Sequence, residues 1–371
     1  MIRVAHRVSF RSLPRIPIAH GARNLSIYGP CISKVGQRSI YELSGPDTLK
    51  FLQGNTTNNI LPFKTIHRNA PNHHGMDGHY TGFLNPQGRI MADAWIHWLP
   101  SEHDESVLVE VDQTISKELI RFISRFKLRS KVKIQDVSDQ WSVYQAWGDG
   151  VELCIPRLDK TLLYRDVRAP NMGWRFLVHK EVSANHLQQL TQLPEDEYKI
   201  HRYLQGVPEG ASEIIMGSSL PLESCMDYMH GVDFHKGCYI GQELTARTYF
   251  TGLVRKRIVP IMLTASTINR SGTIEVDRDA SNILPAHGAD IYLTEQDENG
   301  ESRIKKTARS RSAGKFLNGI HNIGLGLIRL AQLEKIQSPE NTPYLVLSSE
   351  SANGPVQLHA WKPDWWPTIN E

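Results

Sequence analysis

The chain changes its pattern once, near Arg247, and this change limits the folds it can adopt. Before that residue, short apolar runs typical of strands alternate with helical patterns. After it, the apolar runs are short, β-like and separated by glycine, proline and polar loops; they are LVRKRIVPIML, ADIYLTEQ, IGLGLIRL and PYLVLSS. This order predicts an α+β chain in which a mixed α/β part precedes a small C-terminal β-barrel.

Local signals place several elements in the first part. The segment QRSIYELSGPDTLKFLQGNTTNNI predicts a strand, a turn at residues 44–46, and a short helix. Pro46 suits its first turn, and Asp47 lies where the helix dipole favours an acid. The sequence Asn85-Pro86-Gln87-Gly88 predicts a hairpin turn between two apolar runs. A strand and then an amphipathic helix are expected over residues 106–128.

We predict three folded parts after a leader. The first mixed unit covers residues 26–148 and includes strands at KVKIQDV and WSVYQAWG. The second covers 149–250, with strands near 162 and 175–178 and helices near 181–192 and 196–205. The third part, the β-barrel with the C-terminal tail, covers residues 251–371. The sequence suggests no function for residues 333–371. The segment 295–315, acidic and then basic, is expected to be an exposed hairpin loop.

The N-terminal segment has the composition of a mitochondrial transit peptide. Residues 1–41 contain no Asp or Glu, and arginines recur every four residues from Arg3 to Arg15. The motif RNLS resembles a matrix-protease cleavage pattern with the cut after Leu25. We therefore expect a presequence over residues 1–25 and a mature protein in the mitochondrial matrix. The alternative is a disordered basic arm.

The net charge of +3 belongs largely to this leader. Without residues 1–25, Lys plus Arg falls from 42 to 37 against 39 acids, a net charge of −2. A balanced chain lacks the electrostatic footprint of a nucleic-acid-binding protein. No stretch approaches the roughly 20 apolar residues of a membrane-spanning helix. We expect a soluble protein that binds neither nucleic acid nor membrane and is monomeric when alone.

The stretch HKGCYIGQEL, residues 235–244, gives one of the four cysteines an unusual setting. Lys236 and His235 bring cations that favour a thiolate, and a helix is expected to begin at Gly241-Gln242-Glu243. Gly237 and Gly241 lack side chains, so a bulky partner could approach the sulfur of Cys238, although glycines also mark ordinary tight turns. The chain has no C-x-x-C pair, which is typical of a reducing compartment.

At this stretch the chain resembles a known family. KGCYIGQE is similar to the signature of the YgfZ-type branch of the aminomethyltransferase (glycine-cleavage T-protein) superfamily, whose mitochondrial members are iron–sulfur cluster assembly factors. ELSGPDTLKFLQGNTTNNI, HRYLQGVPEGASEI, LPLES and IGLGLIRL resemble other family segments in the same order. The resemblance covers about residues 35 to 332.

The resemblance implies two mixed α/β units around a folate-sized cavity, plus a C-terminal barrel. It implies a factor that acts late, with A-type scaffold proteins, in the maturation of 4Fe–4S clusters. Cys238 matches the signature cysteine and is the candidate ligand to a cluster shared with a partner, because one cysteine provides only one of about four ligands. The signature loop adds Lys236, Gly237, Tyr239, Gly241, Gln242 and Glu243. Tyr239 is expected to pack, Gln242 and Glu243 to fix the backbone or cap the helix, and Arg247 to pair with Glu243.

The rival interpretation is a tetrahydrofolate-dependent one-carbon transferase. T-proteins carry two adjacent acids where GRIMADAW keeps only Asp93, and a glutamate where this chain has Leu204. These losses favour a non-enzymatic assembly factor, although folate contacts by Asp93 and Arg202 remain a hypothesis. The alternatives are a solvated strand residue for Asp93 and a surface salt bridge for Arg202. A third interpretation is a scaffold whose thiol is incidental.

Other candidates have simpler explanations. His67, His73, His74 and His79 crowd one region but lack the ligand spacing of a metal site, so a solvated loop is expected. Cys225 precedes Cys238 by 13 residues, and nothing in this spacing brings the two together. Trp361, Trp365 and Trp366 are expected to pack against the barrel.

Overall fold

The structure is a computed structural model. It describes residues 29–61, 78–99, 106–155, 160–182, 187–264, 276–278, 284–296, 302–304, 312–337, 345–351 and 354–367. The expected presequence, three histidines of the histidine-rich region (His67, His73 and His74) and residues 305–311 of the basic segment lie outside these ranges. Within them, no helix has the length and apolarity needed to cross a membrane.

The first sheet is antiparallel and carries the predicted hairpin. Its strand order is β3 (Gly78–Leu84), β4 (Ile90–Leu99), β5 (Ser106–Asp112), β2 (Arg38–Ser44) and β6 (Lys133–Asp136). In the turn between β3 and β4, the Asn85 side-chain oxygen accepts the N–H groups of Gln87 and Arg89. The hairpin predicted from Asn85-Pro86-Gln87-Gly88 is therefore confirmed.

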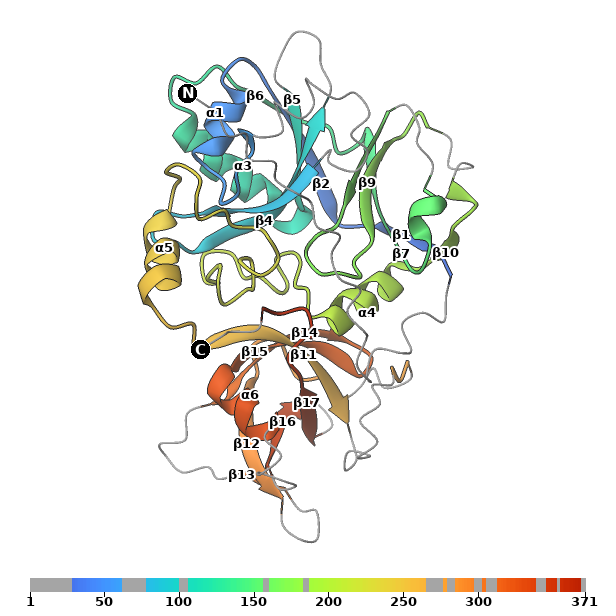
Figure 1. Ribbon diagram of the computed structural model, residues 1–371, viewed down its shortest axis with the longest axis vertical. Coiled ribbons are helices and arrows are strands. Elements are labelled where there is room, and N and C mark those ends of the chain that lie inside the picture. Colours follow the sequence, from blue (N-terminus) through green and yellow to red (C-terminus); the bar gives the residue numbers. More distant parts are fainter. Residues whose placement is uncertain are drawn as a thin grey trace, which may run out of the picture.

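Helix α3 (Gln113–Lys127) covers one face of this sheet (Figure 1). Asp112 begins it by accepting the Thr114 N–H at 2.8 Å, an N-cap bond. Leu119 and Ile123 then pack on alternate residues of β5 (Val107, Val109 and Val111). The predicted amphipathic helix is confirmed, and the opposite face of the sheet is left for other contacts.

The short helix α1 (Thr48–Gln53) is present where it was predicted, with Asp47 at its N-cap position but without a capping hydrogen bond from the Asp47 side chain. The Asp47 side chain instead accepts the Lys131 N–H at 2.7 Å, which joins the helix start to the loop before β6. Asp47 thus lies at the helix start, as predicted, and its carboxylate also makes a long-range bond.

The second sheet takes strands from both sides of the predicted domain boundary. Its order is β10 (Thr191–Leu193), β1 (Cys31–Val35), β7 (Trp141–Trp147), β9 (Trp174–His179) and β8 (Thr161–Arg165). WSVYQAWG, predicted to complete the first unit, is β7 and pairs with β1 and β9. The described part of the helix predicted over 181–192 is instead turns and the start of β10, whose residues Thr191–Leu193 pair in parallel with β1.

The barrel lies at the other end of the molecule, and α4 (Glu195–Gln205) lies between it and the second sheet (Figure 1). Its strands are β11 (Lys256–Thr264), β12 (Asp290–Gln296), β13 (Ser302–Ile304), β14 (Gly314–Ile320), β15 (Ile323–Arg329), β16 (Leu345–Ser351) and β17 (Gly354–Ala360). Pairing of β12 with β16 closes the ring, and α6 (Leu330–Gln337) packs beside β15 and β16. The predicted barrel is present. The C-terminal strands β16 and β17 are part of its wall.

The C-terminal tryptophans pack where the barrel meets the α/β part. Trp366 is buried against Tyr228 at 5.4 Å between ring centroids, and Trp365 donates its ring N–H to the Gln205 carbonyl at 2.8 Å. The packing predicted against the barrel is present for Trp361, which stacks on His359 of β17, and for Trp366, whose ring lies 5.9 Å from the Arg257 guanidinium of β11. Trp365 contacts the end of α4 instead.

Candidate functional site

Cys238 is the one exposed thiol of the chain. Cys31 and Cys225 are buried, and Cys154 is partly buried. Burial raises the pKa of both Cys31 and Cys225 to about 12, which keeps them protonated and unreactive. Cys225 donates its S–H to the Ile258 carbonyl inside the core, so it is not a partner for Cys238 at the surface.

Lys236 anchors the signature loop to the segment that follows α1. Its ammonium donates to the carbonyls of Gln53, Thr56 and Asn58 at 2.8, 2.6 and 2.7 Å. It also lies 5.1 Å from the centre of the Tyr239 ring. Burial lowers the pKa of Lys236 to about 7, while three carbonyl acceptors favour its charged form. Lys236 was expected to favour the thiolate of Cys238, but its observed contacts hold the loop in position.

Further hydrogen bonds join the same two segments. Thr57 donates its hydroxyl to the Gly231 carbonyl at 2.6 Å, and Asn58 donates its amide to the His230 carbonyl at 2.8 Å. The Ile240 N–H donates to the Gly54 carbonyl at 3.1 Å. The polar run after α1, residues 55–59, is therefore the support of the cysteine loop.

The two signature glycines have different environments. Gly241 has φ +78°, and a Cβ built on it would lie 2.2 Å from the Asn85 carbonyl oxygen. Gly88 of the hairpin turn also lies against Gly241, because a Cβ built on Gly88 would lie 3.0 Å from the Gly241 carbonyl oxygen. Gly237 has open space instead. Gly241 thus serves internal packing, and only Gly237 leaves room beside Cys238.

The remaining signature residues fix the loop and begin helix α5 (Gln242–Thr251). The Gln242 side-chain oxygen accepts the Tyr239 N–H at 3.2 Å, as predicted for a residue that fixes the backbone. Tyr239 packs on the core, and burial raises its pKa to about 12. The predicted pair of Glu243 with Arg247 is present at 3.7 Å and is exposed. His235 is exposed beside Asp233, with 3.8 Å between the ring nitrogen and the carboxylate.

Cys238 borders a hollow of about 400 Å³ on the surface. The hollow is lined by α1 and the residues around it: Pro46, Leu49, Lys50, Gln53, Gly54 and Leu61. Within the described ranges, no three His, Cys, Asp or Glu side chains gather in a way that could hold a metal ion. The exposed sulfur is therefore a single potential ligand beside an open space.

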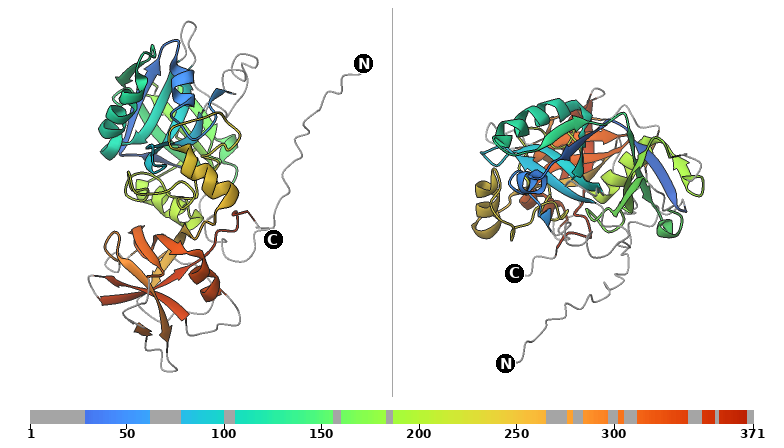
Figure 2. Two further views of the ribbon diagram at one scale, coloured as in Figure 1. Left: turned by 90° about the vertical axis from the view of Figure 1, so that its left-hand side faces the viewer. Right: turned by 90° about the horizontal axis from the view of Figure 1, so that it is seen from above.

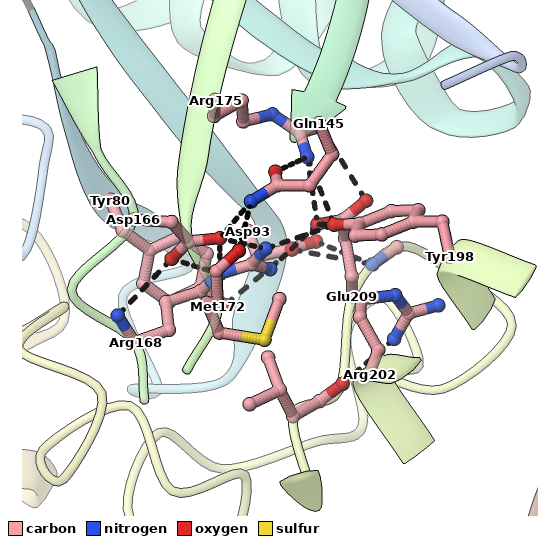
Figure 3. A network of polar contacts seen from close by, with 12 residues as sticks. Tyr80, Asp93, Gln145, Asp166, Arg168, Met172, Arg175, Tyr198, Arg202 and Glu209 are labelled. Atoms are coloured by element: carbon pink, nitrogen blue, oxygen red, sulfur yellow. Dashed lines mark hydrogen bonds and ion pairs between the residues drawn. The ribbon is translucent and has the colours of Figure 1, made fainter. Parts of the chain in front are cut away.

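A buried network of charged groups lies between the two sheets, in the region where the family resemblance implies a folate-sized cavity (Figure 3). Strand alternation turns Asp93, His97 and Glu110 of the first sheet toward Gln145 and Arg175 of the second. Glu110 accepts from Arg38, Arg175 and His97, and these partners lower its pKa against the effect of burial.

Arg168 occupies the middle of this network. Its guanidinium donates to Asp166 at 2.7 Å and to Glu209 at 2.6 Å, and all three groups are almost completely buried. It also lies 4.5 Å from the centre of the Trp95 ring. Ion pairs and an aromatic face together compensate the desolvation of this cation.

Asp93 is a buried member of the network. It is 1% exposed and accepts the Gly210 N–H at 3.1 and 3.2 Å through its two oxygens. Burial raises its pKa to about 6. The alternative of a solvated strand residue was wrong, because the Asp93 side chain is buried and accepts a backbone N–H of the segment after α4.

Arg202 is also buried, and its salt bridge is internal. It donates to both Glu213 oxygens at 2.7 and 2.9 Å and to the Val207 carbonyl. The alternative of a surface salt bridge was therefore wrong. Leu204 packs against the barrel. Folate binding through Asp93 and Arg202 would require both side chains to leave protein partners.

Sequence patterns missed this network. Glu110 lies between Val109 and Val111, and Arg175 lies beside Phe176, both in runs assigned as strands. A charged residue between apolar neighbours on a half-buried strand signals a partner across the sheet, but not which one. Of the histidines, His79 lies on β3, and burial lowers its pKa to about 3, so a solvated loop was wrong for it. Within the 295–315 segment, the pairing of β12 with β13 gives the predicted hairpin, whereas Ala313 is buried and residues 314–315 belong to β14, so the end of the segment is not an exposed loop.

Comparisons with known proteins agree on the fold and on a family. The family described as "CAF17, C-terminal beta-barrel domain" matches residues 255–368. A solved structure of the glycine cleavage system aminomethyltransferase T from Bartonella henselae superposes with a TM-score of 0.62. The superposition covers 92% of this chain and 87% of the aminomethyltransferase chain at 10% sequence identity, which shows a shared fold.

Curated relatives are much closer in sequence. A protein of Mycosarcoma maydis named "Iron-sulfur cluster assembly factor IBA57 homolog, mitochondrial" is 40% identical over 347 residues, which cover 91% of this chain and 85% of the relative. A protein of the same name from Pyricularia oryzae is 36% identical over 345 residues, 88% of this chain and 82% of the relative.

Proposed function

The chain belongs to the IBA57 family of mitochondrial iron–sulfur cluster assembly factors, and we propose that it acts late in this assembly, with an A-type scaffold protein, in the maturation of 4Fe–4S clusters. Cys238 supplies one thiolate to a cluster that is shared with the partner. The cluster is the cargo of this reaction. The observation that supports the role most strongly is the exposed sulfur of Cys238 on an anchored loop beside an open hollow.

The chemistry follows from the isolation of this thiol. A cluster needs about four ligands, and Cys238 offers one. Within the described residues no group of three or more His, Cys, Asp or Glu side chains could hold a metal ion, so the partner or a small thiol completes the set. When Sγ bonds to iron, its proton leaves to solvent, which is accessible because the side chain is exposed.

The anchored loop presents this ligand in one place. Lys236, Gln242 and Gly241 hold the backbone on both sides of Cys238, while Gly237 leaves space beside the sulfur. A ligand held in advance loses less conformational freedom when it binds. The geometry therefore supports transfer between proteins rather than storage within one chain.

A tetrahydrofolate-dependent transferase is the alternative. It would use Asp93 and Arg202, which now contact Gly210 and Glu213. Tetrahydrofolate binding that is lost in Asp93→Asn and retained in Cys238→Ser would support this alternative. Binding would also make folate a candidate ligand or regulator of the assembly factor.

The test is anaerobic mixing of the mature protein with an A-type scaffold that carries a cluster. Visible absorption and native mass are recorded for the wild type, for Cys238→Ser and for Cys154→Ser as a matched control thiol. We expect a heterocomplex with thiolate-to-iron bands for the wild type and the control, and its loss in Cys238→Ser.

Three results would contradict the proposal. A Cys238→Ser protein that forms the same cluster-bearing complex would show that the sulfur is not a ligand. Equal loss in Cys154→Ser would show a general effect of removing thiols. If the complex forms without a cluster in every variant, the third interpretation, a scaffold with an incidental thiol, is correct.

A further inference from the structure

Exposed apolar side chains are concentrated on both sides of Cys238. Seven large apolar residues are exposed within the described part of the chain. Four of them flank the signature loop: Leu61 at the hollow, and Tyr249, Phe250 and Leu253 at the end of α5. The other three (Leu128, Leu153 and Val167) belong to other parts of the fold. A concentration of this kind is typical of a protein contact surface.

Helix α5 does not bury its apolar residues as a surface helix normally does. Of its ten residues only Thr245 is buried, whereas Phe250 is 65% exposed and Leu253, just after the helix, is 75% exposed. Helix α3 turns Leu119 and Ile123 inward instead. The exposed surfaces of Phe250 and Leu253 do not contribute to the core of this chain, which indicates that they contact another molecule.

The α5 residues continue the surface of the cysteine loop. Phe234, four residues before Cys238, stacks on Tyr249 with 3.6 Å between ring centroids, and its ring meets that of Phe250 edge-on at 6.1 Å. Phe250 is eight residues beyond the start of α5, or about 12 Å along the helix. Figure 2 (left) shows α1 and α5 on the same side of the molecule. A protein that reaches Cys238 therefore also reaches these side chains.

The charges around this surface are mostly positive. The exposed charged residues next to the hollow, the hairpin turn and α5 are Lys50, Arg89, Glu243, Arg247 and Arg255. Four are cations and one is an anion. A cluster bound by thiolates is net negative, because the thiolates outweigh the charge of the inorganic core. This cationic border therefore favours a cluster-loaded protein over a second copy of this chain, whose border is equally positive.

We propose that Leu61, Tyr249, Phe250 and Leu253 form an apolar docking surface, divided by Cys238, for the protein that supplies the remaining cluster thiolates. The proposal rests on the function proposed above. The partner presents an apolar face with an acidic border, covers both sides of Cys238 and thereby removes the shared cluster from water. The aromatic residues provide contact area, and Cys238 provides the coordinate bond.

The test compares two double variants in the same cluster-loaded A-type scaffold assay. Phe250→Ser with Leu253→Ser changes the docking surface and leaves the stack of Tyr249 on Phe234 in place. Leu128→Ser with Leu153→Ser, at 89% and 86% exposure, is the matched control elsewhere on the surface. Kd is measured by anaerobic calorimetry, and thermal unfolding checks that both variants fold.

We expect the α5 variant to weaken binding by about 10- to 100-fold and the control to change it less than about threefold. Wild-type Cys238 remains in both, so thiolate-to-iron bands still form at saturating scaffold. Equal affinities of the two variants would overturn the docking surface while leaving Cys238 as a ligand. A wild-type dimer that Phe250→Ser with Leu253→Ser converts to a monomer would assign the surface to a second copy and overturn the proposal.

Loss of the cluster bands in Cys238→Ser is the separate criterion for the function itself. If Cys238→Ser keeps those bands, the proposed function fails, whatever the α5 variants do. If only Cys238→Ser loses them and the α5 variants bind normally, the function holds and the docking surface fails.

Discussion

The interior between the two sheets and the surface around Cys238 reverse the usual distribution of polar and apolar groups. The interior holds Arg168, Arg175, Glu110 and Glu209, almost completely buried, whereas the surface exposes Phe250 and others near the thiol. The buried charges satisfy one another through ion pairs. The exposed aromatic rings contact one another and Phe234, but they keep a large part of their surface open to solvent.

This difference separates a closed region from an open one. In the closed region Arg168 and Arg175 contact buried carboxylates and Asp93 accepts a backbone N–H, so any added ligand must compete with existing bonds. In the open region the segment after α1 anchors the signature loop, and the Cys238 side chain on the loop is exposed to solvent. The fold shared with a solved aminomethyltransferase structure carries no information about the position of the functional site, because a site depends on its own side chains and not on the fold.

The largest expected effect comes from breaking the closed region. Arg168→Met should lower the free energy of unfolding by about 3–5 kcal/mol, because Asp166 and Glu209 would remain buried without their cation. Urea unfolding measures this. Lys199→Met, which breaks an exposed pair with Asp196 on α4, is the control and should cost less than about 0.5 kcal/mol. Similar costs for both variants would show that the network is not structural.

The second expected effect is a pH dependence of stability that arises from the buried carboxyl of Asp93. Its folded-state pKa of about 6 exceeds the ordinary value of 3.8, so the folded protein holds a proton that the unfolded chain releases between these pH values. Asp93 therefore lowers the stability of the wild type as pH rises from 4 to 6. The stability of Asp93→Asn relative to the wild type should increase by up to about 3 kcal/mol over that range.

Urea unfolding of both proteins at pH 4, 5, 6 and 7 provides the measurement. A difference that does not change with pH, or one that decreases, would show that the Asp93 carboxyl is ionised in the folded state throughout. Asp93 would then resemble an exposed carboxylate and could serve a ligand.

A smaller effect is expected from the signature glycines. Gly241→Ala should cost about 2 kcal/mol, because its Cβ would meet the Asn85 carbonyl and its φ of +78° disfavours alanine. Gly237→Ala has open space and should change stability by less than about 0.5 kcal/mol. Urea unfolding checks both. If the partner approaches the sulfur closely, Gly237→Ala will still weaken the cluster-bearing complex, and unchanged binding would mean that this space stays free.

The sequence by itself determined the local features and the family. Turn residues defined the hairpin at Asn85–Gly88, alternation defined most strands, and KGCYIGQE identified the signature loop and its exposed thiol. These features depend on neighbours a few residues apart, or on a motif long enough to be specific. The helix beginning at Gln242 and the pair of Glu243 with Arg247 belong to the same class.

Only the tertiary structure decided which distant segments meet. Lys236 finds its three carbonyl acceptors 178 to 183 residues earlier in the chain, and β7 joins the second sheet by pairing with β1. Asp93 and Arg202 became buried for the same reason, since their partners come from the segment after α4. The alternation of side chains along a strand predicts which residues face inward. Which charged group lies opposite such a residue depends on how the two sheets pack.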